Sequence, residues 1–415
     1  MLGYFSIWPF FVEIGLLLAI AATPLLRGAD VAPAPGGNRT GSLDGLRGFL
    51  ALGVFFHHVA ISQQYLRNGQ WISPTSRFYN LLGGSGVALF FMITGYLFYG
   101  QLLRTKGRPH WKKLYTGRLF RILPLYWFMF ALVLLGVGID TGWHRHMGRL
   151  TILLQTARWS LGGLFKEAPI NGSALAQQIT ASVTWTLQYE WLFYLSLFFL
   201  AFAVRRRWVG RTLPPLLLCA VLLEGVLAGK PQLEWMSVGL LLTGMSVAII
   251  KTAKPDLRIQ STLGSVLVIA LLIAAFLTAR SIYTPLPVVF LGLAFLLICM
   301  GADIFGLLLT QPARRLGNIS YGIYLLQGAV LTAASSIGKV RALDLTSPVD
   351  HWLVSLAEAL TLIALATLAH RFIERPAIDL GRRLLAGEAP QVLDRLRPRR
   401  PQHIVTSLPS ADAAD

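Results

Sequence analysis

Long uninterrupted apolar runs are the feature that most restricts how this chain can fold. Runs of roughly 17 to 23 apolar residues recur along nearly its whole length, and each is long enough to cross a hydrocarbon core of about 30 Å as a helix. The mean hydropathy of +0.59 and a charged fraction of only 13% exclude an ordinary water-soluble domain. Spanning strands would be shorter and would alternate apolar with polar residues. The sequence therefore predicts an all-α, polytopic integral membrane protein.

Hydropathy and turn signals together predict about eleven transmembrane helices. A shorter segment, Leu150–Phe165, carries Arg158 and is expected to be an interfacial or re-entrant element on the outer face. The expected spans are Tyr4–Leu26, Leu43–Ser62, Gly84–Leu103, Leu119–Ile139, Trp185–Val204, Leu213–Leu227, Trp235–Ile250, Leu263–Ala279, Leu286–Met300, Ile319–Ile337 and Trp352–Phe372.

Lysine and arginine residues indicate the orientation of these spans. The loops Arg104–Arg121 and Arg205–Arg207 are expected to be cytoplasmic, because short cytoplasmic loops carry an excess of basic residues. Alternation then puts Lys251–Arg258, Arg314–Arg315 and the tail from Arg382 on the same side, with the N-terminus outside and the C-terminus cytoplasmic. The net charge of +18 is therefore assigned to membrane orientation, and nucleic-acid binding is not expected.

Composition divides the chain into three parts. Residues 1–40 contain a span that is too long for a signal-peptide core and is followed by Arg27, which predicts a retained, accessory anchor helix. A Pro/Gly-rich linker, residues 32–37, joins it to the membrane domain at 41–385. Residues 386–415 are rich in Pro, Arg and Ala, and predict a disordered cytoplasmic tail.

Titratable residues inside apolar runs are the first candidates for chemistry. Arg47 and His58 are eleven positions apart, so on a helix they lie within about 20° of one face and about 16 Å apart along the axis. Burial favours the neutral imidazole, which can accept a proton from a hydroxyl group. His58 is therefore a candidate general base, the alternative being a histidine that only bonds a neighbouring helix. His57 points about 100° away and is the expected structural partner.

A pair of arginines starts another span. Arg118 and Arg121 are three residues apart and are candidates for binding phosphate groups of a cytoplasmic acyl donor, because guanidinium groups bind phosphate in a bidentate manner. Arg47 lies at the same end and can pair with Asp44. Membrane anchoring is the alternative, and it is preferred for Lys112–Lys113.

Glu190 lies within the aromatic stretch Trp185–Tyr194, near the expected outer end of its span. An unpaired carboxylate is costly there, which makes Glu190 a candidate to orient an imidazole or to bind acceptor hydroxyl groups. The alternative is an interfacial carboxylate among aromatic-belt residues.

Three other features point away from particular chemistries. Cys219 and Cys299 lie in apolar runs without metal-ligand spacing, so neither a disulfide framework nor a metal site is expected. The glycines of residues 83–86 lack the Lys-Ser/Thr ending of a phosphate loop and predict close helix packing or a loop bend. A serine-hydrolase elbow is absent from the sequence.

Several motifs, in order and with matching spacing, resemble the membrane-bound acyltransferase-3 family. The resemblance covers roughly residues 41–383. It rests on Leu43–Arg47 with His58, Gly86–Tyr96, Arg118–Pro124, Trp185–Tyr194, Ser320–Leu325 and Glu374–Pro376.

The resemblance implies a ten-helix core with both ends cytoplasmic, here preceded by one extra helix, in a bacterial inner membrane. It implies transfer of an acyl group, often acetyl from acetyl-CoA, to a hydroxyl of a carbohydrate or other acceptor on the far side. Arg47 and His58 would be the essential R-x10-H pair, and Arg118 and Arg121 the R-x-x-R pair associated with the acyl-CoA donor.

The resulting prediction is a membrane-bound O-acyltransferase. His58, Arg47 and Glu190 are its expected catalytic residues, and Arg118, Arg121 and Arg47 its expected donor-binding residues. The expected partners are acyl-CoA, a carbohydrate or lipid-linked saccharide acceptor and the lipid bilayer, with no metal and no nucleic acid. Whether His58 acts as a base or carries the acyl group stays open.

One position departs from the family pattern, and one rival function is retained. Gln327 stands where many members have a histidine, so that residue's contribution is absent or is made by an amide. The rival is a polytopic transporter or lipid flippase, in which intramembrane His and Arg line a path without covalent chemistry. Such proteins can show paired half-repeats with broken helices, which the sequence does not reveal.

Overall fold

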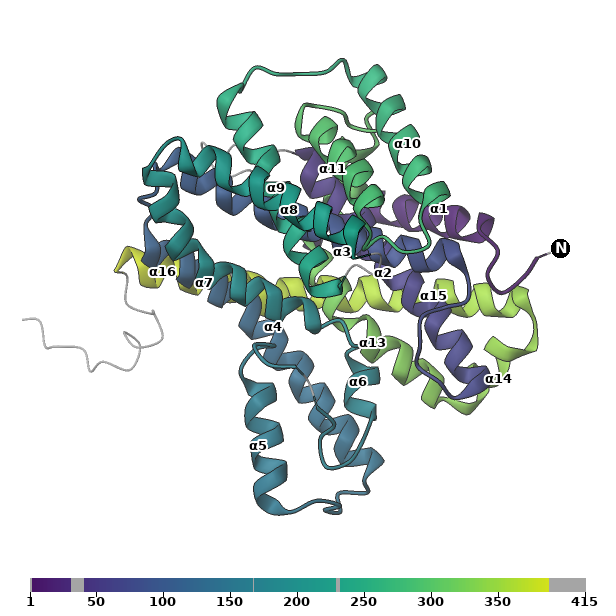
Figure 1. Ribbon diagram of the computed structural model, residues 1–415. Coiled ribbons are helices and arrows are strands. Elements are labelled where there is room, and N and C mark those ends of the chain that lie inside the picture. Colours follow the sequence, from purple (N-terminus) through teal and green to yellow (C-terminus); the bar gives the residue numbers. More distant parts are fainter. Residues whose placement is uncertain (1, 31–40, 167, 229–231, 388–415) are drawn as a thin grey trace, which may run out of the picture.

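The protein is a bundle of helices (Figure 1). The computed structural model describes residues 2–30, 41–166, 168–228 and 232–387. Within these ranges it contains no strand beyond an isolated bridge between Ile170 and Ser173. The predicted linker at 32–37 and the predicted tail from residue 388 onward lie outside the described residues. The all-α prediction is confirmed.

Eight of the described helices are long and apolar enough to cross a membrane. The helices α13 (Ser320–Ser336) and α14 (Gly338–Thr346) are bent by 92° and make a ninth candidate if taken as one span. Two further apolar helices, α1 (Trp8–Ala22) and α11 (Pro285–Cys299), have 15 residues each, so the count of eleven stays a prediction. The eight are α2 (Gly41–Asn68), α3 (Arg77–Arg104), α4 (Trp111–Asp140), α7 (Trp185–Arg205), α8 (Val209–Leu227), α9 (Leu233–Ala253), α10 (Ser261–Thr278) and α15 (Pro348–Ala369), which continues through η3 (His370–Glu374) into α16 (Arg375–Ala386).

Helix α2 is the most buried of the eight, and glycines bring its neighbours close. A Cβ on Gly83 of α3 would lie 2.4 Å from the Cγ of His57, and one on Gly86 would lie 2.7 Å from Val54. Close helix packing, one of the two predictions for residues 83–86, is therefore confirmed.

The first turns of α2 pack just as closely against η2 (Leu307–Leu309) and α12 (Gln311–Asn318). A Cβ on Gly45 would overlap the carbonyl of Leu308, and one on Gly48 would lie 2.8 Å from the backbone nitrogen of Gly317. We call this end of the bundle, with the nearby loops 105–110 and 206–208, the basic end. The start of α2 is held rigidly there.

Helix α1 packs into the bundle along its length. At its C-terminal end the buried Arg315 guanidinium donates to both carboxylate oxygens of Asp30, at 2.8 and 2.9 Å, and to the carbonyls of Ala21 and Thr23. At the other end the Tyr79 hydroxyl donates to the carbonyl of Ser6 at 2.7 Å. Hydrogen bonds thus fasten the predicted accessory helix to the membrane domain at both ends.

The chain between α4 and α7 folds back along α4. Helix α5 (Arg149–Ser160) runs beside the second half of α4, and the Tyr126 hydroxyl donates to the carbonyl of Trp159 at 2.8 Å. In Figure 1 this pair projects from the lower side of the bundle, with the short α6 (Leu175–Ile179) next to it. The predicted element at Leu150–Phe165 is thus a helix that returns to the middle of α4.

We expect Arg315→Ala to lower the unfolding free energy by about 3 kcal/mol, because four charge-assisted hydrogen bonds are lost and α1 loses its anchor. The midpoint of thermal unfolding in detergent measures this loss. The control is Arg314→Ala, which removes an exposed neighbouring arginine. Equal midpoints for the two variants would contradict the assignment.

The same ion pair has a defined pH dependence. Hydrogen bonding to Arg315 holds the pKa of Asp30 below its ordinary value of 3.8. The contribution of the pair to stability is therefore fully present above that value, and it is lost as the pH falls through the lower folded-state pKa. Thermal midpoints of the wild type and Asp30→Asn should differ at neutral pH and converge in strong acid.

Candidate active site

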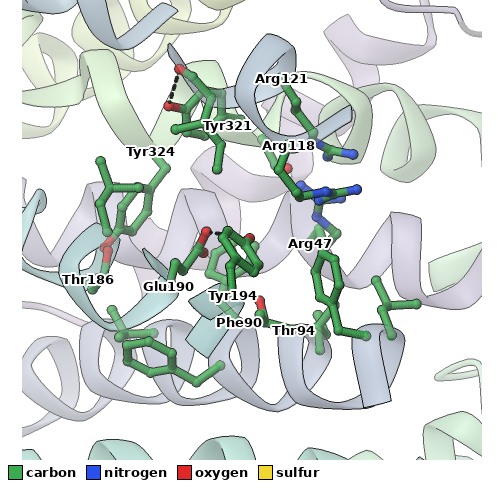
Figure 2. Close-up of a pocket in the computed structure, with 18 residues that line it drawn as sticks. Arg47, Phe90, Thr94, Arg118, Arg121, Thr186, Glu190, Tyr194, Tyr321 and Tyr324 are labelled. Carbon is green, nitrogen blue, oxygen red and sulfur yellow. Dashed lines mark hydrogen bonds between the residues drawn. The ribbon is translucent and has the colours of Figure 1, made fainter. Parts of the chain in front are cut away.

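A cavity of about 130 Å³ lies among α2, α3, α4, α7 and α13 (Figure 2). We call it the arginine cavity. Figure 2 shows three arginine side chains gathered on one side and Tyr324 and Thr186 on the opposite side, with Glu190 and Tyr194 between them. Its charged and polar lining consists of Arg47, Thr94, Arg118, Arg121, Thr186, Glu190, Tyr194, Ser320, Tyr321 and Tyr324.

Helix geometry explains why these side chains converge. Gly45 and Gly48 face η2 and α12, which leaves Arg47 on a different face of α2, toward the cavity. Arg118 and Arg121 share one face of α4 because they are three residues apart. The three arginines that the sequence singled out are therefore brought together.

Positive charge dominates the arginine cavity. Three guanidinium groups face a single carboxylate, that of Glu190, which accepts a hydrogen bond of 2.9 Å from the Tyr194 hydroxyl. The Arg118 guanidinium also lies 4.7 Å from the centre of the Phe98 ring. Asp44, one turn before Arg47, offsets part of the remaining charge. An excess of positive charge remains, and an anionic ligand would neutralise it.

Glu190 lies deeper than its predicted position near the outer end of a span. Helix α7 begins at Trp185, whose ring lies 6.1 Å from that of Phe91, close to the midpoint of α3. The returning segment before α7 therefore starts this helix inside the bundle. A position five residues further on reaches the arginines, so Glu190 meets Arg118 and Tyr194 and does not share a cavity with His58.

A larger cavity of about 480 Å³ lies toward the opposite end of the bundle. We call it the histidine cavity. Loops between helices contribute Trp71, Ser182 and Tyr283, and the helices contribute His57, His58 and Asn80. Its volume falls within the range of roughly 300–1,000 Å³ that is usual for small-molecule sites.

The hydrogen bonds of His58 define its tautomer. Its Nδ1 lies 2.9 Å from the carbonyl oxygen of Val54, and a carbonyl can only accept, so Nδ1 carries the proton. In a neutral ring Nε2 then holds the lone pair, and Gln327 and the backbone of Ala181 also lie within hydrogen-bonding reach of the ring. The neighbouring His57 donates in the same way to the carbonyl of Tyr79, at 3.0 Å. A general base needs a free lone pair of this kind.

Two further features surround the His58 ring. Gln327 lies next to it, is fully buried, and has an Oε1 atom without a partner among the described residues. Ala181 and Ser182 have φ angles of +49° and +56°, which non-glycine residues rarely adopt. Unsatisfied buried oxygens and strained backbone are both typical of functional sites.

The two cavities lie on either side of a partition. Arg47 and His58 line different cavities, although both are on α2. Val87 and Tyr324 line both cavities. The structure thus joins Arg47, Arg118, Arg121 and Glu190 in one site and places His58 in an adjacent one.

Sequence reasoning missed the uncharged residues of these cavities. Thr186 and Tyr194 lie four residues before and after Glu190 on α7, and Ser320 and Tyr324 are four residues apart on α13. That spacing was visible in the sequence. Trp71, Asn80 and Tyr283 carry no comparable signal, because loops bring them together.

A family model described as an acyltransferase domain, Acyl_transf_3, matches residues 40–368. The chain belongs to this acyltransferase family. It is similar to Nodulation protein 10 of Rhizobium leguminosarum bv. viciae, with 27% identity over 370 residues, which are 83% of this chain and 95% of that protein. No solved structure matches it. Family membership and the membrane-spanning helices together identify a membrane acyltransferase, which disfavours the transporter alternative.

We expect Gly83→Ala to destabilise the protein by about 1–3 kcal/mol, because the new Cβ would overlap the His57 ring. The double variant Gly83→Ala with His57→Ala should recover part of this loss. A double-mutant cycle of unfolding free energies measures the coupling. Strictly additive changes in unfolding free energy would show that the His57 ring does not clash with the added Cβ.

Proposed function

We propose that this protein is an O-acyltransferase that moves an acetyl group from cytoplasmic acetyl-CoA to a hydroxyl of an envelope or exported carbohydrate. The observation that carries the proposal is the pair of adjacent cavities, one rich in arginine and the other containing His58, whose Nδ1 is hydrogen-bonded to a carbonyl. Acyl transfer from acetyl-CoA to a hydroxyl group requires this anionic, phosphate-bearing donor and the acceptor to meet at one base. The two cavities match these two requirements.

The charge of the arginine cavity supports an acyl-CoA donor. CoA carries phosphate groups, and arginine is the side chain best suited to bind them in a bidentate manner. Arg118, Arg121 and Arg47 are therefore the proposed donor-binding residues. The basic end would face the cytoplasm of a bacterial cell, in agreement with the distribution of lysine and arginine residues.

The size of the arginine cavity favours a short acyl group. A cavity of about 150 Å³ in another protein holds one benzene molecule. The arginine cavity, at about 130 Å³, has room for a thioester and a few carbon atoms but not for a long fatty acyl chain. Acetyl is the proposed group for this reason.

The lining of the histidine cavity suits a sugar. Trp71, Trp185 and Tyr283 offer aromatic faces to the C–H surfaces of a pyranose ring, while Asn80 and His57 are placed to bond its hydroxyl groups. The volume of about 480 Å³ accommodates one or two sugar units. A carbohydrate or lipid-linked saccharide is the proposed acceptor.

In the proposed reaction, Nε2 of His58 removes the proton from the acceptor hydroxyl while the oxygen attacks the thioester carbonyl carbon. The new C–O bond replaces the C–S bond, and CoA leaves as a thiolate that takes up the proton from His58. A thioester is already activated, so positioning the reactants next to a base supplies much of the acceleration. Glu190 is proposed to hold the Tyr194 hydroxyl and to balance the arginines.

We expect His58→Ala to reduce acetyl transfer at least a hundredfold, because the acceptor hydroxyl loses its base. The assay follows label from acetyl-CoA into glycans in membrane vesicles at matched protein abundance. His144→Ala, which removes an exposed histidine, is the control. Equal transfer by wild type and His58→Ala would contradict the proposed mechanism.

We expect Arg121→Ala to raise the KM for acetyl-CoA about tenfold or more, since a charge-assisted contact to phosphate is lost. Arg118→Ala should act in the same direction. The matched control is Arg207→Ala, an exposed arginine at the same end. An unchanged KM in both cavity variants would remove the support for donor binding there.

A further inference from the structure

A single tyrosine, Tyr324, stands between the two cavities. Of the two residues that line both cavities, Val87 is a short aliphatic side chain, whereas Tyr324 is a ring that can rotate about its χ1 bond. Figure 2 shows Tyr324 across the arginine cavity from the three arginines. A group that leaves the arginines for His58 meets this ring.

Two neutral hydrogen bonds hold the Tyr324 hydroxyl. The hydroxyl lies 3.0 Å from Oγ1 of Thr186 and 3.3 Å from the carbonyl of Val183. Oγ1 of Thr186 also lies 3.0 Å from that carbonyl, so the two hydroxyl groups share their two protons among three contacts. Phe90 contacts the ring edge-on at 5.9 Å between centroids. Cavities lie next to the ring on both sides, and they offer space for a rotation.

From this placement we propose that Tyr324 is a gate between the donor and acceptor cavities and the residue that limits the length of the transferred acyl group. The inference rests on the proposed function, because it concerns the path of the acyl group from the arginines to His58. In the closed position the ring separates the thioester from the histidine cavity. Rotation away from Thr186 opens the partition and lets the thioester carbonyl reach the acceptor hydroxyl.

The position of the Tyr324 ring also accounts for the proposed selection of acyl groups by their length. An acyl group that enters from the arginines points toward Tyr324, so each added methylene group must displace the ring further or find space beside it. A pocket that rejects one extra methylene group commonly does so by about 10- to 200-fold. Acetyl is the group that fits in front of the ring.

The test compares acetyl-CoA with hexanoyl-CoA as labelled donors in vesicles that contain the wild type, Tyr324→Ala, Tyr324→Phe or Tyr324→Trp. Tyr324→Ala should raise the ratio of hexanoyl to acetyl transfer about tenfold or more, because the partition is removed. Tyr324→Phe keeps the ring and should keep the wild-type ratio. Tyr324→Trp should lower kcat about tenfold while leaving the KM for acetyl-CoA unchanged, since a larger ring obstructs passage but not donor binding.

A control separates the gate from general loosening of the bundle. Phe295→Ala removes a buried ring of α11 that lines neither cavity, and should leave the donor ratio unchanged. The inference is overturned if Tyr324→Ala and Phe295→Ala give the same ratio, or if a folded Tyr324→Trp transfers acetyl at the wild-type rate. The proposed function is tested separately. It still holds if the wild type transfers acetyl from acetyl-CoA and His58→Ala abolishes that transfer.

Discussion

Three guanidinium groups that share one half-buried carboxylate impose the main electrostatic constraint on this bundle. Arg47, Arg118 and Arg121 come from two helices and Glu190 from a third, so α2, α4 and α7 must meet at one level. An unpaired charge in an apolar interior is costly, which makes the arrangement stable only with hydrogen-bond partners and a counter-ion. The Tyr194 hydroxyl supplies one such partner, and an anionic ligand would supply the counter-ion. The same charges therefore also define which helices are neighbours.

Close backbone contacts fix the position of α2 relative to the helices around it. Because Gly45 and Gly48 have no side chain, the start of α2 packs closely against η2 and α12. Gly83 and Gly86 likewise allow α3 to pack closely against the later turns of α2. A helix held on two sides cannot rotate freely, so Arg47 and His58 keep their directions. Function on α2 thus depends on residues that touch no substrate.

Much of the fold was predictable, because hydropathy reports helix positions directly. Hydropathy predicted the all-α membrane bundle, and the three-residue spacing of Arg118 and Arg121 placed both on one face of α4. Hydropathy misplaced Glu190, because it assumes that Trp185–Val204 crosses the whole membrane, whereas the returning segment starts α7 beside Phe91. The histidine cavity was hidden for another reason: Trp71, Asn80 and Tyr283 are brought together by loops, which have no periodic signal.

The separation of the two cavities bears on the problem that any transfer across a membrane must solve. A permanently open path from the arginines to His58 would admit water to the thioester and ions to the bilayer interior, and a permanently closed one would prevent reaction. Helix α13 carries residues of both cavities, with Ser320 and Tyr321 beside the arginines, Gln327 beside His58, and Tyr324 between them. The proposed gate, one ring whose hydroxyl contacts only Thr186 and the Val183 carbonyl, would satisfy both demands, because a side-chain rotation replaces a rearrangement of helices. In the proposed mechanism the bundle then stays rigid while only the acyl group crosses.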